Sequence, residues 1–202
     1  MKQFIKKRWP WIVGACILVA VLVLLLARCG NDPAAGDPTL TVETLQKLSA
    51  SQRESFSLDV TISSLGDARY PAMSMSIAFD SSRLEFLGVE EGNIFILSDE
   101  NSTGQQLPEW SCNVGSSNDT GLINIMYLDM TGGRNAFTKS LWVEGNNVVL
   151  RLKFRLRGSV RPGDVLDLIV EDAVFAASDE AQSLAVTTDT LKVKNGRLVI
   201  GE

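Results

Sequence analysis

The sequence predicts an all-β fold, a two-sheet antiparallel β-sandwich of the jelly-roll type with about nine strands, preceded by one N-terminal transmembrane helix. Three observations support this prediction. An uncharged apolar run lies near the start, apolar and polar residues alternate repeatedly after residue 38, and turn-forming residues separate the alternating segments. The 202 residues suffice for one domain of ordinary size and a short additional segment.

The N-terminal region has the pattern of a membrane anchor. Residues 1–10 form a basic segment, and residues 11–28 form the expected transmembrane helix, since Trp11 to Ala27 contain no charged side chain. As a helix that run spans roughly 25 Å, which is close to the thickness of a bilayer core. Basic segments beside a membrane helix stay in the cytoplasm. We therefore expect a single-pass signal anchor in the cell membrane, with a cytoplasmic N-terminus and an extracellular C-terminal domain.

Two alternatives for this region remain open. One is a cleaved signal peptide, although Arg28 interrupts the small residues that usually precede the cleavage site. The other is a lipoprotein with a lipidated Cys29, because Leu26 to Cys29 match a lipobox at two positions. All three interpretations place the domain outside the cell. Residues 29–38 are rich in Pro, Gly and Asp and are expected to form a linker.

Residues 39–202 are expected to form the domain itself. Apolar side chains recur there at every second position, which is the pattern of strands with one face in a core and one in water. The clearest alternating segments are residues 56–62, 73–79, 148–156, 166–170, 191–193 and 198–200. Turn signals lie between them, among them Asp80-Ser81-Ser82, Arg161-Pro162-Gly163-Asp164 and Asn195-Gly196. A short helical turn is expected near Thr44–Leu48.

Charge and composition disfavour several classes of function. Five of the 19 Lys and Arg residues lie in residues 1–28, where there is no acid, so the remaining 14 bases and all 24 acids give the rest of the chain a net charge of −10. An acidic domain is a poor partner for phosphate backbones, so nucleic-acid binding is not expected. The chain has no histidine, the commonest general base and metal ligand. We expect no cofactor, no metal and no enzymatic activity.

The order of several segments resembles the cohesin family, the β-sandwich modules of bacterial scaffoldins. The matching segments are Ser57 to Ile62, Met75 to Asp80 followed by Leu84 to Val89, Ile123 to Asp129 with Gly132-Gly133 after it, Val149 to Leu156, and Asn195 to Ile200. The resemblance covers residues 39–202. It implies a non-catalytic, cohesin-like module that binds the dockerin modules of polysaccharide-degrading enzymes and tethers them at the cell surface.

In that family the binding surface is one open sheet face, built from strands that correspond to residues 70–79, 110–113 and 123–129. Many dockerin-binding members carry an Asn and an Asp two residues apart on the first of these strands, where this chain has Ala72 and Ser74. Leu128 replaces an acid that is common on the third. The resemblance therefore implies a less polar interface. The candidate partner-binding residues are Ala72, Ser74, Ser76, Trp110, Ile125, Tyr127 and Leu128.

The segment 122–128 is apolar on both sides. Ile123, Ile125 and Tyr127 alternate with Leu122, Met126 and Leu128, so in a two-layer sandwich one set faces solvent unless another segment covers it. We expect an accessible apolar patch that includes Tyr127, a frequent interface anchor. Coverage of this patch by the loop 98–121 is the alternative.

Other features suggest ligands of different kinds. Trp110 and Trp142 could stack on sugar rings, which would make the domain a polysaccharide-binding module, although core packing is the more common role. The stripe from Arg151 to Arg157 could contact an acidic wall polymer, or it could be a solvated strand face. Asp99, Glu100, Asn101 and Asp119 fit no EF-hand spacing. A structural domain for envelope assembly is a third possibility, without a dockerin partner.

Overall fold

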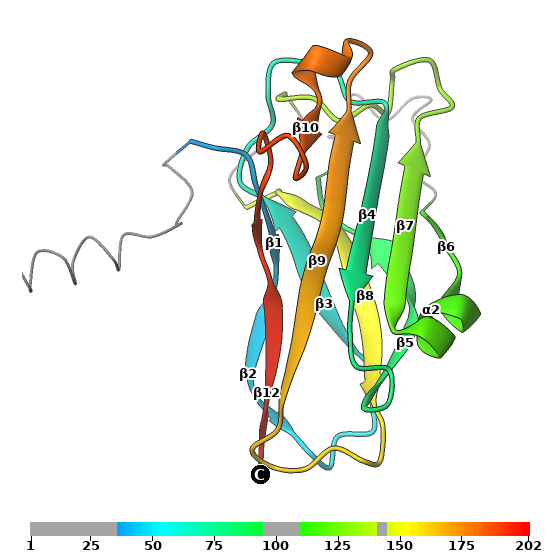
Figure 1. Cartoon of the computed structure of the whole chain (residues 1–202), viewed down its shortest axis with the longest axis vertical. Helices are drawn as coiled ribbons and strands as arrows, with labels where there is room; N and C mark the ends of the chain where they lie inside the picture. Colours follow the sequence, from blue (N-terminus) through cyan, green and yellow to red (C-terminus); the bar gives the residue numbers. More distant parts are fainter. Residues whose placement is uncertain (1–35, 95–109, 141–144) are drawn as a thin grey trace, which may run out of the picture. The chain divides into compact units, whose positions relative to one another are not determined.

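The computed structural model describes residues 36–94, 110–140 and 145–202. In this part of the chain two β-sheets pack face to face (Figure 1), which confirms the predicted two-sheet sandwich. The strands in chain order are β1 Thr39–Val42, β2 Thr44–Ser49, β3 Phe56–Ile62, β4 Ala72–Ala78, β5 Leu84–Glu91, β6 Ser111–Cys112, β7 Leu122–Leu128, β8 Val148–Leu156, β9 Val165–Ala176, β10 Leu184–Ala185, β11 Lys192–Lys194 and β12 Gly196–Gly201. The helices are α2 Val114–Thr120 and the 3-10 helix η1 Glu180–Gln182.

The five-stranded sheet has the order β11-β1-β3-β8-β5. Its central strands alternate as the sequence predicts. In β3 the side chains of Leu58, Val60 and Ile62 are fully buried, whereas the residues between them are partly exposed. Burying each such side chain stabilises the fold by about 1.5–3 kcal/mol, so this alternation fixes which face of the strand packs in the core.

The seven-stranded sheet has the order β2-β12-β9-β4-β7-β6, and β10 pairs with β9. Its longest strand, β9, pairs with β12 along Val165–Leu168 and with β4 along Ile169–Ala176. The register shifts within the β4–β9 pairing: Ile77 lies opposite Val170, but Ser76 lies opposite Asp172. Glu171 is therefore the extra residue of a β-bulge, which bends the strand and reorients the side chains that follow.

Aromatic side chains fill the space between the sheets. Phe86 from β5 and Phe154 from β8 have ring centroids 5.5 Å apart, and Phe79 lies 5.6 Å from Phe154. Phe137 and Phe175 form a second edge-to-face contact at 5.3 Å. Contacts of this kind stabilise a core beyond simple burial of area, and here they join elements that are far apart in the chain.

The chain crosses from the five-stranded to the seven-stranded sheet twice, once between β1 and β2 and once between β11 and β12. β1 lies in the five-stranded sheet and β2 in the seven-stranded sheet, and β11 and β12 repeat this division. Both contacts between these segments are parallel, β1 with β11 and β2 with β12, so the expectation of a purely antiparallel sandwich is corrected at these edges. A side chain at Gly196 would place Cβ 2.5 Å from Val42 Cγ1 and 2.8 Å from the Glu43 carbonyl oxygen, so this crossing needs glycine.

One local prediction is wrong here. Thr44–Ser49 forms strand β2 rather than a helical turn, because its backbone pairs with β12; tertiary pairing outweighs local propensity in this segment. The predicted turn signal Asn195-Gly196 lies where β11 ends and β12 begins, and Asn195 Oδ1 accepts a hydrogen bond of 3.0 Å from the Val170 N–H.

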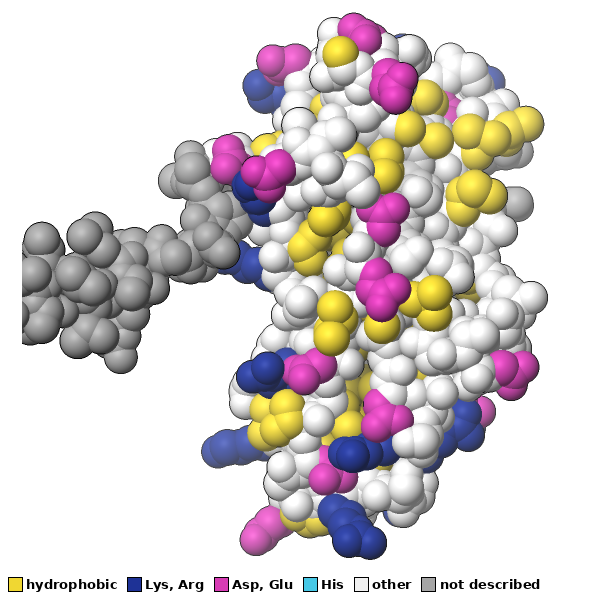
Figure 2. Space-filling model, viewed as in Figure 1, with side chains coloured by type: hydrophobic (Ala, Val, Ile, Leu, Met, Phe, Trp, Pro, Cys, Tyr) yellow, Lys and Arg dark blue, Asp and Glu magenta, His cyan; other side chains and the backbone are white. Residues whose placement is uncertain are grey.

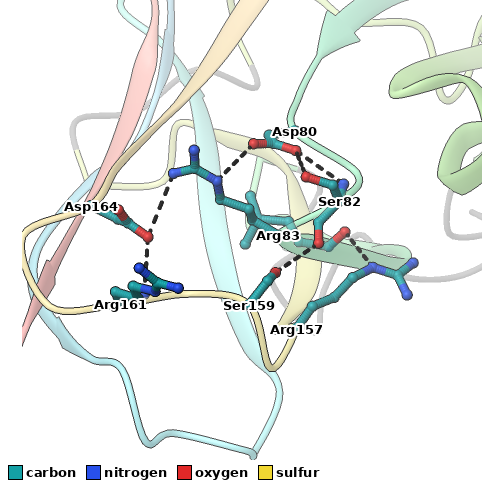
Figure 3. A network of polar contacts seen from close by, with 8 residues as sticks. Asp80, Ser82, Arg83, Arg157, Ser159, Arg161 and Asp164 are labelled. Atoms are coloured by element: carbon teal, nitrogen blue, oxygen red, sulfur yellow. Dashed lines mark hydrogen bonds and ion pairs between the residues drawn. The ribbon is translucent and has the colours of Figure 1, made fainter.

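The end of the sandwich near the β4–β5 and β8–β9 turns is held by a polar network (Figure 3). Asp80 Oδ1 accepts from the Ser82 N–H at 3.0 Å, which confirms the predicted turn. Arg83 contacts Asp80 at 3.1 Å and Asp164 at 3.5 Å, and Asp164 also accepts from the Arg161 N–H at 2.9 Å. Arg83 thus joins the two turns, which restrains this end of the molecule.

Helix α2 covers the outer edge of β5. Its N-cap Asn113 accepts a hydrogen bond from the Ser116 N–H at 2.9 Å, and Gly121 ends it in the left-handed conformation. The side-chain amide of Asn118 makes the two backbone hydrogen bonds that a neighbouring strand would make. Its Oδ1 accepts from the Phe86 N–H at 2.9 Å and its Nδ2 donates to the Phe86 carbonyl at 2.8 Å. The helix therefore supplies backbone hydrogen-bond partners that an edge strand would otherwise lack.

The expected membrane segment lies outside the described residues, as do the loop positions Asp99 to Asn101 and Trp142. Among the residues that are described, none of the helices is both long enough and apolar enough to cross a bilayer. Ala35–Glu202 form a compact unit with its own hydrophobic core, which permits measurements on that fragment.

We predict that Asn118→Ala lowers the free energy of unfolding of the fragment Ala35–Glu202 by about 1–3 kcal/mol, because the Phe86 N–H and C=O both lose their partner at a covered edge. Urea unfolding followed by tryptophan fluorescence measures this change. Asp119→Ala is the matched control on the exposed side of α2, with an expected change within about 0.5 kcal/mol. Equal stability of Asn118→Ala and wild type would show that the Asn118 contacts contribute nothing.

Candidate functional site

The outer side of the seven-stranded sheet forms an open face over β9, β4, β7 and β6, which we call the docking face. β4 is its axis, with β9 on one side and β7 on the other. Direct cross-strand partners fix its rows: Ala72 lies between Ala176 and Leu128, Ser74 between Val174 and Met126, and Ser76 between Asp172 and Asn124. Side chains in one row lie about 5 Å apart, so the face presents a defined pattern rather than a mobile loop.

Exposed apolar side chains gather on the β7 side of the docking face. Met126 is 57% exposed and Leu128 56% exposed, while Met130, just after the strand, is 84% exposed. The side chain of Asp129 accepts hydrogen bonds from the N–H and hydroxyl of Thr131, which holds the turn that carries Met130. Large hydrophobic side chains that remain exposed next to one another indicate an interaction surface.

A polar row crosses the centre of the same face. Ser76 Oγ donates a 2.7 Å hydrogen bond to Asn124 Oδ1 on β7, and Asp172 lies directly opposite Ser76 on β9. Figure 2 shows acidic side chains in the middle of this view between hydrophobic ones, with basic side chains near its margins. The docking face therefore combines apolar, hydroxyl, amide and carboxylate groups.

The structure corrects the predicted side of β7. Ile125 is 2% exposed and Tyr127 3% exposed, and both side chains point into the core. The expectation that the side chain of Tyr127 is accessible on the outer face is therefore wrong, and the same burial applies to Ile125. Of the two alternating sets of the strand, the accessible one contains Met126 and Leu128. Tyr127 instead donates a 2.8 Å hydrogen bond to the Asn135 carbonyl. Burial first, and the charge of Asp129 second, raise the pKa of Tyr127 to about 12.

Trp110 supports the face from its edge. It is partly buried, and its ring lies 5.4 Å from Tyr127 and 6.3 Å from Phe137, centroid to centroid. Its indole N–H is covered and has no hydrogen-bond acceptor among the described residues. The indole ring therefore packs against the aromatic side chains of the core, which favours a core-packing role for Trp110 over stacking on a sugar.

The predicted residues of β4 do lie on the docking face. Ser74 is exposed, and Ala72 and Ser76 are partly exposed. Their role in binding stays a prediction, as does that of Leu128. The β9 side of the face, with Ile169, Glu171 and Asp172, was not among the predicted site residues, because the predicted alternating segment ended at Val170. The residues Val165, Asp167, Ile169 and Glu171 continue the period-two pattern and could have revealed it.

The outer side of the five-stranded sheet differs in kind. The basic stripe of β8 faces carboxylates of the neighbouring strands, in the pairs Arg151–Asp59 at 2.8 Å, Lys153–Glu90 at 2.6 Å and Arg155–Glu85 at 3.4 Å. The hydrogen bonds from Lys153 and Ser57 lower the pKa of Glu90. Charges paired in this way favour a solvated strand face over a site for an acidic polymer.

Within residues 36–94, 110–140 and 145–202, no cluster of three or more His, Cys, Asp or Glu side chains could hold a metal ion. The acidic candidate Asp119 lies exposed on α2, and Asp179 caps η1 by accepting a hydrogen bond from the Ala181 N–H at 3.2 Å. Neither position brings carboxylates together.

Comparisons with known proteins agree with this architecture. The family model of the cohesin domain matches residues 42–193. The sixth cohesin of scaffoldin B from Acetivibrio cellulolyticus, solved in complex with a Cel5 dockerin mutant, superposes with a TM-score of 0.58 at 17% identity, over 81% of this chain and 99% of that chain. A search of curated proteins gave no match.

Two further structures show the same fold. The cohesin of OlpA from Clostridium thermocellum, in a type I complex with the dockerin Doc918, has a TM-score of 0.58 and 18% identity, over 82% of this chain and 99% of that chain. A non-cellulosomal cohesin from the archaeon Archaeoglobus fulgidus has a TM-score of 0.53 and 14% identity, over 83% and 93% of the two chains. At these identities the similarity establishes the fold.

We predict that Tyr127→Phe lowers the free energy of unfolding by about 1 kcal/mol at pH 8, because the Asn135 carbonyl loses its donor. The raised pKa makes the folded state hold the tyrosine proton more tightly than the unfolded chain, whose pKa is near 10. This contribution is complete below pH 10 and is lost as the pH rises toward 12. The stability difference between wild type and variant should therefore shrink between pH 10 and pH 12.

Urea unfolding of both proteins at several pH values measures this difference. Thr61→Val, which removes a partly exposed hydroxyl from β3, controls for general effects of losing a hydroxyl. A difference between wild type and Tyr127→Phe that stays constant with pH would contradict the assigned cause.

Proposed function

This chain belongs to the cohesin family, and from that membership we propose that it binds a dockerin-type protein module through the docking face over β9, β4, β7 and β6. Cohesins are non-catalytic binding modules, so the chain is not an enzyme. The observation that carries the proposal is the exposure of Met126 and Leu128 beside the neutral side chains of β4.

The related structures support this assignment. The cohesins of Acetivibrio cellulolyticus and Clostridium thermocellum were solved in complexes with dockerins. The docking face also meets the physical requirements of a binding surface: it is built on strands, its side chains are positioned by cross-strand pairs, and its inner side is supported by Tyr127 and Trp110.

An interface on this face would depend on apolar contact. A few well-packed side chains usually dominate the binding energy of an interface, and Met126 and Leu128 are the large apolar groups nearest to Ser74 and Ala72, their direct partners on β4. Methionine adapts its shape to different partner surfaces. With Ala72 and Ser74 in place of the Asn and Asp of many dockerin-binding members, this part of the interface carries little charge.

We further propose that residues 11–28 anchor the module in the cell membrane, so that it tethers a partner enzyme at the cell surface. The uncharged apolar run and the basic segment before it support this proposal. Residues 29–38, rich in Pro, Gly and Asp, are the proposed linker between this anchor and the domain.

We predict that immobilised Ala35–Glu202 binds at least one dockerin encoded in the same genome with a Kd of about 1 μM or tighter. Leu128→Glu should weaken that binding at least tenfold, because it introduces a charge into the apolar part of the interface. Biolayer interferometry with the purified dockerins measures both.

Thr61→Glu is the matched control, since it adds the same charge to the outer side of the five-stranded sheet and should leave the affinity within about twofold. Failure of every dockerin to bind the wild-type fragment would refute the proposed function. Binding that Leu128→Glu leaves intact would refute the choice of face.

We predict that the full chain sediments with membranes and resists extraction by alkaline carbonate, whereas the same chain without residues 1–34 stays soluble. Protease added to intact cells should digest the domain if it lies outside. A full chain that carbonate releases, or one that is protected from external protease, would contradict the anchoring proposal or the orientation, respectively.

A further inference from the structure

The docking face has an unbalanced charge. Strands β9, β4, β7 and β6 contain no Lys or Arg, whereas β9 contains Asp167, Glu171 and Asp172. Asp167 is neutralised by Arg197 of β12 at 2.8 Å. Glu171 and Asp172 have no ion pair with any residue that the structure describes. The outer side of the five-stranded sheet is different, because Arg151, Lys153 and Arg155 of β8 each pair with an acid of a neighbouring strand.

The β-bulge places these two acids at the centre of the face. Regular alternation would bury one of two consecutive residues, but the extra residue lets Glu171 be exposed and Asp172 partly exposed, while Val170 and Ala173 on either side are buried. Asp172 then lies beside Ser76, the central residue of the polar row. The bulge thus places two negative charges beside β4, where a partner protein bound over β4 would contact them.

Neighbouring groups do not compensate this charge. The Ser76 hydroxyl donates to Asn124, so its proton is directed away from Asp172. The inner carboxylate oxygen Oδ1 of Asp172 is covered and has no hydrogen-bond donor among the described residues. A carboxylate in a partly covered position is stabilised strongly by a cation that approaches its accessible side.

The apolar part of the face lies within reach of the same partner element. Neighbouring strands are about 4.8 Å apart, so β9 and β7 lie roughly 10 Å apart across β4. This distance is close to the diameter of an α-helix with its side chains. One helix laid on β4 can therefore contact Met126 on one side and Asp172 on the other.

We propose that Glu171 and Asp172 determine partner specificity, and that the dockerin bound here carries a Lys or Arg that contacts them, next to apolar side chains that contact Met126 and Leu128. This inference rests on the proposed function. A dockerin with an acidic side chain at that place is rejected, because like charges would be brought together as water is excluded. A basic one gains charge-assisted hydrogen bonds.

The test compares Glu171→Gln/Asp172→Asn with wild type in the fragment Ala35–Glu202. The probes are the dockerins of the same genome that bind the wild-type fragment. We expect the double variant to bind at least tenfold more weakly at 50 mM salt, and its affinity to depend less on salt than that of wild type, because a close charge pair is lost. Replacement of the Lys and Arg residues of the bound dockerin by Ala, one at a time, should identify one whose loss weakens binding to wild type but not to the double variant.

Glu54→Gln/Asp119→Asn is the matched control, since it removes the same two charges from exposed positions outside the face; its affinity should stay within twofold of wild type. Circular dichroism checks that each variant is folded. If a dockerin binds wild type and the double variant equally, this inference fails and the proposed function stands. If no dockerin binds the wild-type fragment, both fail.

Discussion

The two-residue repeat of the β-strand is the constraint on which the rest of this structure depends. Each residue of β7 faces either the core or the outside, so burying Ile123, Ile125 and Tyr127 places Asn124, Met126 and Leu128 on the surface. The aromatic contacts of Tyr127 with Trp110 and Phe137 hold this orientation. A core that packs well on one side of the sheet thereby creates an apolar surface on the other, and the two cannot be changed independently.

A β-bulge and two sets of polar side-chain contacts supplement this two-residue repeat. At the β9 bulge, one additional residue within the part of β9 that pairs with β4 brings Glu171 and Asp172 to the same side of the sheet. At the edge of β5, Asn118 replaces the hydrogen bonds of a missing strand. The polar network around Arg83 restrains the turns at one end of the sandwich.

The long strands could be predicted because each repeats the apolar-polar pattern several times, as β3 and β8 do. The short strands β6 and β10 have two residues each, too few to show a period, and β2 mixes exposed and half-buried positions. Each of these three exists because a partner strand lies beside it. The family resemblance placed the candidate face on strands that form the open side of the seven-stranded sheet. The choice of Tyr127 as an exposed residue was wrong, because alternation separates two sets of residues without showing which set meets the other sheet.

The sequence alone therefore determined the β-sandwich class, the family, the acidic charge of the domain and the two alternating sets of β7, because each of these follows from composition or from patterns along one segment. Only the tertiary structure decided which set is exposed, how the bases of β8 are neutralised, and where Glu171 and Asp172 lie relative to Ser76. These features depend on the register between strands that are distant in the chain, and register is set by packing of the whole core rather than by any local run of residues.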